Sequence, residues 1–130
     1  MQVVKFFSFG FAVAFFLSGC GKSIQDLSEL TDENASKLSY EEFAMAVCQS
    51  IKEDDISAVR QYADNSFIQR LQSYKRKGKL QELQEEIDCS DVEIQVMVDN
   101  QQQEFNVAKF ADTKFRISMK KEYGSYVIYR

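Results

Sequence analysis

The sequence contains no histidine, no proline and no tryptophan among its 130 residues. The absence of histidine removes the commonest general base, the usual zinc ligand and every serine–histidine or cysteine–histidine catalytic pair. Most hydrolase mechanisms are therefore disfavoured. The absence of proline means that no helix or strand is broken by a residue that lacks a backbone N–H.

Basic residues are also few compared with acidic residues. Acidic residues outnumber basic ones by 20 to 16, which gives a formal net charge of −4. Because a phosphate backbone attracts basic surfaces, a nucleic-acid partner is disfavoured. Hydrophobic residues make up 45% of the chain, and 11 Phe and 6 Tyr supply bulky core material. This composition indicates one small globular domain rather than a disordered chain.

The first 19 residues differ in composition from the rest and are predicted to be a targeting segment. Residues 6–17 form an almost wholly apolar run after a short stretch that contains Lys5. A helix of this length rises only about 18 Å, whereas the hydrocarbon core of a bilayer is roughly 30 Å thick. The run is therefore typical of a signal peptide rather than of a permanent membrane span.

The segment ends in Leu17-Ser18-Gly19-Cys20, which resembles the lipobox of bacterial lipoprotein precursors at all four positions. The resemblance implies that signal peptide 1–19 is removed and that Cys20 becomes an acylated N-terminus anchored in a lipid bilayer. Gly21 stands where the inner-membrane retention signal of these lipoproteins has Asp. The outer membrane is therefore favoured, with the domain facing the periplasm or the exterior. The alternative is an ordinary secretory signal that ends by chance in a cysteine.

The other two cysteines, Cys48 and Cys89, form an even pair in a chain that is expected to be exported. Because extracytoplasmic compartments are oxidising, we predict a Cys48–Cys89 disulfide. The alternative is two unpaired buried thiols. A catalytic role is disfavoured, because no histidine is present to activate either sulfur.

Residues 20–38 are predicted to be the lipidated cysteine and a polar tether, because the segment is rich in Ser, Asp and Glu. Within it, Ile24, Leu27 and Leu30 recur at every third position. The alternative interpretation is that these residues form a transient helix or a stripe that docks on the domain.

The folded domain is predicted to span residues 39–130 and to begin with helices. A capping box and a hydrophobic staple mark the start of the first helix, in Leu38, Ser39, Glu42 and Phe43. Apolar residues then recur with helical period to about Lys52. Shorter helices are predicted to follow, one capped by Asp54 or Asp55, one capped by Asn65 and ending near Gly78, and one reaching about Asp88.

After Cys89 the period of the apolar residues changes from helical to alternating, which predicts strands. The first strand is expected to point four residues inward, Val92, Ile94, Val96 and Val98. Three more strands are predicted over about residues 105–110, 115–120 and 126–129, joined by short turns. The predicted fold class is α+β, with the N-terminal helices packed on a curved four-stranded antiparallel sheet.

Two stretches carry a resemblance to a known superfamily. The first stretch consists of residues 43–47 followed by 52–56 and by Val59 and Tyr62, and the second is the closing stretch 120–128. Both are similar to the cystatin-like, nuclear transport factor 2-like superfamily, specifically its small bacterial lipoprotein members. Tyr126 stands where an aromatic residue is usual in these proteins. The resemblance implies a cone-shaped pocket between the sheet and a helix. It implies no single function, because the superfamily includes isomerases, transport adaptors and domains without chemistry.

We predict a non-catalytic binding or interaction module at the cell envelope, with an envelope protein or a small apolar ligand as partner and no cofactor or metal. Phe105, Tyr123 and Tyr129 concentrate aromatic area in the C-terminal hairpins and form the candidate binding surface. On the last strand, Tyr129 lies on the face opposite Tyr126, so one of the two is expected in the core and the other is available.

The alternative is a small isomerase or lyase-like enzyme. In this hypothesis Tyr40, Tyr62 or Tyr74 lies in the cone pocket beside a buried carboxylic acid of raised pKa. The strand acids count against it, because Glu93, Asp99 and Glu104 are all expected to alternate outward.

Overall fold

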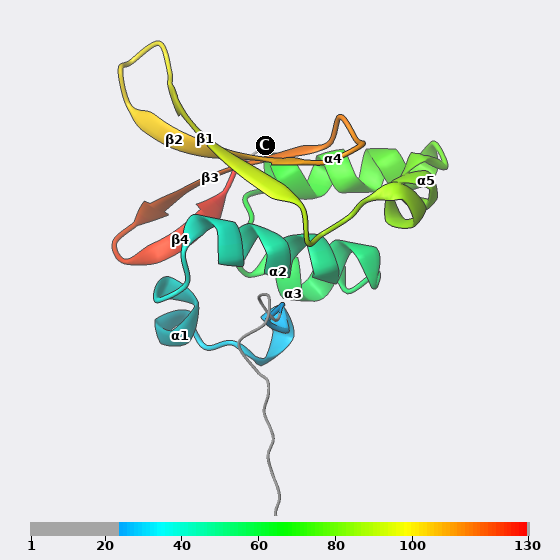
Figure 1. Cartoon of the computed structure of the whole chain (residues 1–130), viewed down its shortest axis with the longest axis horizontal. Coiled ribbons are helices and arrows are strands. Elements are labelled where there is room, and N and C mark those ends of the chain that lie inside the picture. Colours follow the sequence, from blue (N-terminus) through cyan, green and yellow to red (C-terminus); the bar gives the residue numbers. More distant parts are fainter. Residues whose placement is uncertain (1–23, 130) are drawn as a thin grey trace, which may run out of the picture.

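The computed structural model describes residues 24–129, so the predictions for the signal peptide and Cys20 lie outside the described residues. The molecule has two layers, a four-stranded sheet and a set of helices packed on one face of it (Figure 1). The strands follow one another in the order β1-β2-β3-β4, and each neighbouring pair is antiparallel. The predicted α+β class is confirmed.

The helical half comes first in the chain. Its elements are the 3-10 helix η2 (Leu27–Glu29) and the α-helices α1 (Asp32–Ser36), α2 (Tyr40–Lys52), α3 (Ile56–Arg60), α4 (Asn65–Arg76) and α5 (Lys79–Glu86). The predicted capping box begins α2: the Glu42 N–H donates to Ser39 Oγ, and the Ser39 N–H donates to the Glu42 carboxylate. Helix α4 is capped by Asp64 rather than by the predicted Asn65, because the Phe67 N–H donates to the Asp64 carboxylate at 3.2 Å.

The sheet is a meander of four strands, β1 (Val92–Val98), β2 (Glu104–Phe110), β3 (Arg116–Glu122) and β4 (Ser125–Ile128). The register of β1 on β2 is continuous from the pair Val92–Phe110 to the pair Val98–Glu104. A two-residue turn joins β3 to β4. Tyr123 and Gly124 both have positive φ, 54° and 79°, as the tight hairpin turn of type I′ requires.

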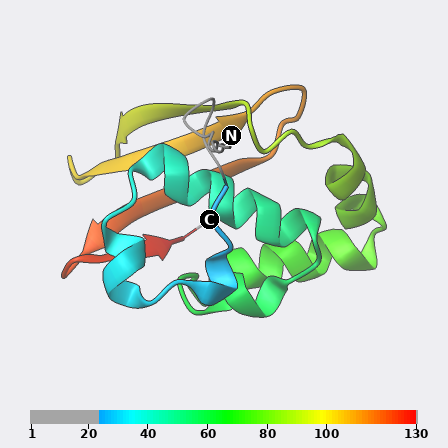
Figure 2. The same cartoon turned by 60° about the horizontal axis from the view of Figure 1, so that its bottom comes forward.

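Helix α2 supplies the centre of the core beneath the inner face of the sheet (Figure 2). Phe43 is fully buried, and its ring stacks on that of Tyr126 from β4 with centroids 4.0 Å apart. Ile117 and Met119 of β3 are also fully buried on this inner face. Close packing of apolar and aromatic side chains from both layers therefore holds the helices to the sheet.

The predicted tether over residues 20–38 is corrected by the structure from residue 24 onward. Leu27 is 0% exposed and Ala35 is 1% exposed, and both belong to the core. Helix α1 packs against β4, and Lys121 Nζ donates to the Ser36 carbonyl oxygen at 2.9 Å. The apolar residues at every third position therefore dock this segment on the domain, which was the alternative interpretation. The domain begins earlier than the predicted residue 39.

The prediction that all four alternating residues of β1 point into the core is also corrected. Val92 and Ile94 pack against the core, but Val96 and Val98 are 60% and 59% exposed. The reason is geometric: the hairpin of β1 and β2 extends beyond the helices that cover the rest of the sheet (Figure 1). Part of the inner face is therefore open to solvent.

Candidate binding surface

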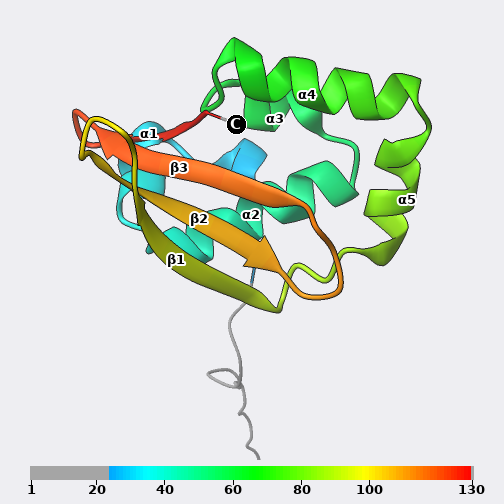
Figure 3. The same ribbon diagram turned by 90° about the horizontal axis from the view of Figure 1, so that it is seen from above.

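The outer face of the sheet, opposite the helices, carries a group of apolar and aromatic side chains. Strand alternation and the register place five residues there, namely Met97, Phe105, Val107, Val127 and Tyr129. We call them the outer-face cluster. Figure 3 shows that no helix of the described chain lies over this face. The cluster draws on three of the four strands or their ends, so only the folded sheet brings it together.

Two aromatic rings form the centre of the cluster. The centroids of Phe105 and Tyr129 lie 5.9 Å apart with an interplanar angle of 69°, an edge-to-face arrangement. Lys120 Nζ lies 5.2 Å from the centroid of the Tyr129 ring and 2.8 Å from the Glu122 carboxylate. The hydrogen bond to Glu122 raises the pKa of Lys120. An ammonium group is thus held at the border of an aromatic surface.

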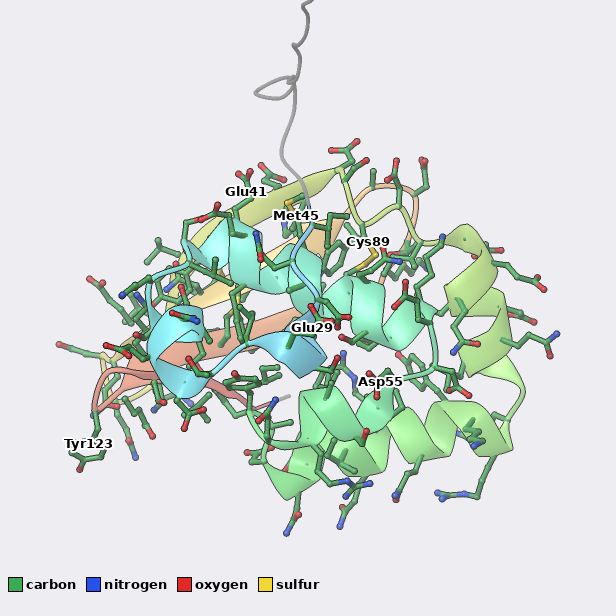
Figure 4. The ribbon with its side chains drawn as sticks, turned by 90° about the horizontal axis from the view of Figure 1, so that it is seen from below. Glu29, Glu41, Met45, Asp55, Cys89 and Tyr123 are labelled. Carbon is green, nitrogen blue, oxygen red and sulfur yellow. A yellow bond between two sulfur atoms is a disulfide. The ribbon has the colours of Figure 1, made fainter. Side chains whose placement is uncertain are left out.

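The three aromatic residues predicted as a binding surface are only partly brought together. Phe105 and Tyr129 are in ring contact, whereas Tyr123 stands apart at the tip of the β3–β4 hairpin (Figure 4). Met97 is 41% exposed and pairs with Phe105 across the β1–β2 ladder. Met97 was not predicted from the sequence, although its outward position in the alternation of β1 could have indicated it. On β4, Tyr126 is in the core, as one of the two expected arrangements required.

Tyr123 is unusual in its backbone conformation as well as in the exposure of its side chain. Its side chain is fully exposed, and its φ of 54° lies in the left-handed region. A residue with a Cβ adopts this region at a cost of about 1 kcal/mol or more, which glycine or asparagine largely avoids. Packing against the described residues does not offset this cost, since the Tyr123 ring points away from the domain (Figure 4).

The interior that the superfamily resemblance marks as a pocket is filled by side chains. The Phe43 ring lies between those of Tyr62 and Tyr126, with centroids 5.3 Å and 4.0 Å away. The Tyr126 hydroxyl donates a short hydrogen bond to the Leu38 carbonyl oxygen, and burial raises the pKa of Tyr126. The Tyr62 hydroxyl is buried without a hydrogen-bond partner among the described residues, and burial also raises its pKa.

The isomerase alternative needs a desolvated carboxylic acid, and the described residues do not supply one. None of the Asp and Glu side chains among residues 24–129 is buried. Tyr74 lines a surface pocket of about 390 Å³ together with Glu82 and Glu86, but both carboxylates are exposed. This pocket therefore lacks the desolvated carboxylic acid that the isomerase alternative requires.

The predicted Cys48–Cys89 pair is confirmed. The two Cα atoms lie 5.5 Å apart in a disulfide that joins α2 to the segment entering β1. Two hydrogen bonds nearby join α2 to α5 and its C-cap, from Lys52 Nζ to the Ile87 carbonyl oxygen at 2.7 Å and from Gln84 Nε2 to the Ile51 carbonyl oxygen at 2.9 Å. The bridge is a structural link, because both sulfurs are consumed in it.

The described part of the chain offers neither a metal site nor a membrane span. Within residues 24–129, no cluster of three or more cysteine, aspartate or glutamate side chains is placed to hold a metal ion. None of the described helices combines the length and the apolar character needed to cross a membrane. Comparisons with protein-family models, with curated proteins and with solved structures found no match to this chain.

Proposed function

We propose that this protein is a lipid-anchored envelope lipoprotein whose domain binds a protein partner through the outer-face cluster and performs no chemistry. The observation that carries the proposal is the uncovered sheet face with the Phe105–Tyr129 pair and the Lys120 ammonium at its border. Aromatic residues dominate the energetics of protein interfaces. An open sheet face suits a protein better than a small ligand, which usually binds in a concave pocket.

The proposed anchor rests on the lipobox-like residues 17–20. The described chain enters the domain at η2, on the side of the helical layer that faces away from the sheet (Figure 2). An acylated Cys20 would therefore hold the helical side toward the bilayer. The outer face of the sheet would then point away from the membrane, where a partner could reach it.

The partner is tested by photocrosslinking in intact cells. A photoreactive amino acid replaces Val127, which belongs to the outer-face cluster and lies far from β1 in the sheet order. A matched control carries it at Gln72, an exposed position on α4. We expect position 127, and not position 72, to capture a specific protein that mass spectrometry identifies. Equal captured products at both positions, or none at position 127, would contradict the proposal.

The anchor is tested separately with labelled palmitate. Wild-type protein should incorporate the label, and the Cys20→Ala variant should not, because acyl transfer requires that thiol. The control is Cys48→Ala, which keeps Cys20. Label on the Cys20→Ala protein, or a mature N-terminus other than Cys20, would contradict the lipoprotein hypothesis without affecting the binding surface.

A further inference from the structure

The two edges of the sheet are treated differently by the fold. The edge of β4 is closed at Ile128 by the chain itself, because the Ile128 N–H donates to the Tyr62 carbonyl oxygen and the Asp64 N–H donates to the Ile128 carbonyl oxygen, both at 2.8 Å. At the other edge, no residue of the described chain beyond β2 pairs with β1 (Figure 3). The sheet therefore ends in one open strand.

Strand β1 also lacks the usual features that keep an open edge from pairing with another strand. Its seven residues contain no proline or lysine, its register on β2 has no bulge, and Glu93 is its only charged side chain. Val96 and Val98 are each about three-fifths exposed, at 60% and 59%. A long, regular, apolar edge strand is a template for pairing with another strand.

The alternation of hydrogen bonds along the β1–β2 ladder shows which backbone groups of β1 are free to pair with another strand. At the two ends of the ladder, the Asp99 N–H donates to the Gln103 carbonyl oxygen, and the Ala111 N–H donates to the Asp91 carbonyl oxygen. Odd-numbered residues of β1 therefore face β2, since hydrogen-bonded and non-hydrogen-bonded pairs alternate along an antiparallel ladder. The even-numbered residues 92, 94, 96 and 98 direct their N–H and C=O groups outward.

From this geometry we infer that β1 is a homodimer interface, in which it pairs antiparallel with β1 of a second copy of this chain in a register centred on Gln95. Several registers pair even-numbered residues of one strand with even-numbered residues of the other. Among them, this register gives the greatest overlap of the two strands. Ile94 then pairs with Val96 of the partner, and Val92 with Val98 of the partner. All outward backbone groups of both strands are paired, and the two four-stranded sheets become one sheet of eight strands.

The side chains of β1 complement themselves in this register, which is why the occupant is a second copy. On the inner face the exposed Val96 and Val98 pack beside the partner's Ile94 and Val92, so apolar residues meet apolar residues. On the outer face Gln95 meets its own copy and Glu93 meets Met97, so no like charges are opposed within the strand. Just outside it, Asp91 faces the partner's Asp99, and this is the one repulsive pair.

A single strand edge is a small contact compared with the about 1,200–2,000 Å² that stable interfaces bury, so the dimer is weak and a covalent trap is the suitable assay. The full chain is expressed with Gln95→Cys, whose symmetric position is a non-hydrogen-bonded pair with Cα atoms about 4.5 Å apart, within reach of a disulfide. We expect a reducible dimer band on a non-reducing gel. Wild type, which has the three native cysteines, sets the background.

The register is tested by two matched variants. Met97→Cys alone and Glu93→Cys alone should stay at background, because each residue lies about 13 Å along the strand from its own copy. Co-expression of the two should produce the crosslink, because position 93 faces position 97 of the partner. Equal yields for the Gln95→Cys and Met97→Cys variants would indicate random collision, and no crosslink at position 95 would indicate an edge that is free or covered by another segment. Either result overturns the inference.

Two further changes in the Gln95→Cys background keep the test independent of a single variant. Val96→Pro removes one outward N–H but no hydrogen bond to β2, and should lower the crosslink yield at least fivefold with an unchanged circular dichroism spectrum. Asp91→Lys turns the one repulsive pair into an attractive pair and should raise the yield at least twofold. If both variants crosslink as well as the parent, the proposed pairing is wrong.

Discussion

Replacing both bridged cysteines by alanine should remove a large share of the stability of this domain. The Cys48–Cys89 disulfide has a sequence separation of 41 residues. In the chain-entropy model, a loop of this length restricts the unfolded chain by about 13 cal/mol/K, which is about 4 kcal/mol at 25 °C. Both side chains are buried, at 0% and 4% exposure, so loss of the sulfurs adds a packing cost of about 1 kcal/mol. Domains of this size are stable by only about 5–15 kcal/mol in total.

The assay is urea unfolding followed by circular dichroism. With a slope of about 1.5 kcal/mol per molar urea, a total loss of about 5 kcal/mol moves the unfolding midpoint of the double variant down by roughly 3 M. Reduced wild type is the matched control, because it keeps both sulfurs and loses only the bond between them. If reduction changes the free energy of unfolding by less than about 1 kcal/mol, the entropic argument is refuted, whatever the double variant does.

The bridge also has a local consequence that hydrogen exchange can measure. Cys89 lies three residues before β1, and the disulfide ties this entry to the buried centre of α2. Reduction should therefore increase the exchange of the amides that bond β1 to β2 more than that of the amides between β2 and β3. Equal increases in both ladders would show that the bridge acts only on global stability.

Further predictions concern single side chains. Tyr123→Asn should raise the free energy of unfolding by about 1 kcal/mol, because asparagine tolerates the φ of 54° better than tyrosine does, and thermal unfolding would measure the change. Ser39→Ala should lower it by about 1 kcal/mol through loss of the α2 cap. Tyr126→Phe should lower the free energy of unfolding by about 1 kcal/mol, because the Leu38 carbonyl oxygen loses its donor. Tyr62→Phe should leave the free energy of unfolding unchanged or raise it, because the Tyr62 hydroxyl has no partner among the described residues. Burial raises the pKa of Tyr126, so the unfolded chain releases this proton first as the pH rises. The contribution of this hydroxyl to stability should be constant below about pH 10 and fall above it, and Tyr126→Phe should weaken that fall.

The elements that the sequence predicted well are those governed by local rules. The capping box at Ser39 and the helical period after it determine where α2 begins and which face it buries. The change to an alternating period located four strands, because alternation is a local property of extended chain. The cysteine pair could be predicted because the lipobox resemblance assigns Cys20 to lipidation, which leaves two cysteines and one possible bridge.

The predictions that were wrong depended on distances between elements. Polar composition suggested a tether before residue 39, but a few apolar side chains such as Leu27 were enough to dock the segment once a surface existed to receive them. Alternation gave the face of Val96, but it does not say how far the covering helices extend. Phe105 and Tyr129 come together only through the register of three strands, which leaves Tyr123 at a distance.

The hydrogen bonds between the early and late parts of the chain restrict the order in which this protein can fold during synthesis. Lys121 bonds to Ser36, Tyr126 to Leu38 and Ile128 to Tyr62, so the late strands complete the packing of helices made much earlier. A chain that emerges from a ribosome or an export channel as far as residue 110 has its helices and β1–β2, yet Phe43 still lacks the ring that stacks on it. Such an intermediate exposes its core until β4 arrives, and it is the state that a chaperone would have to protect.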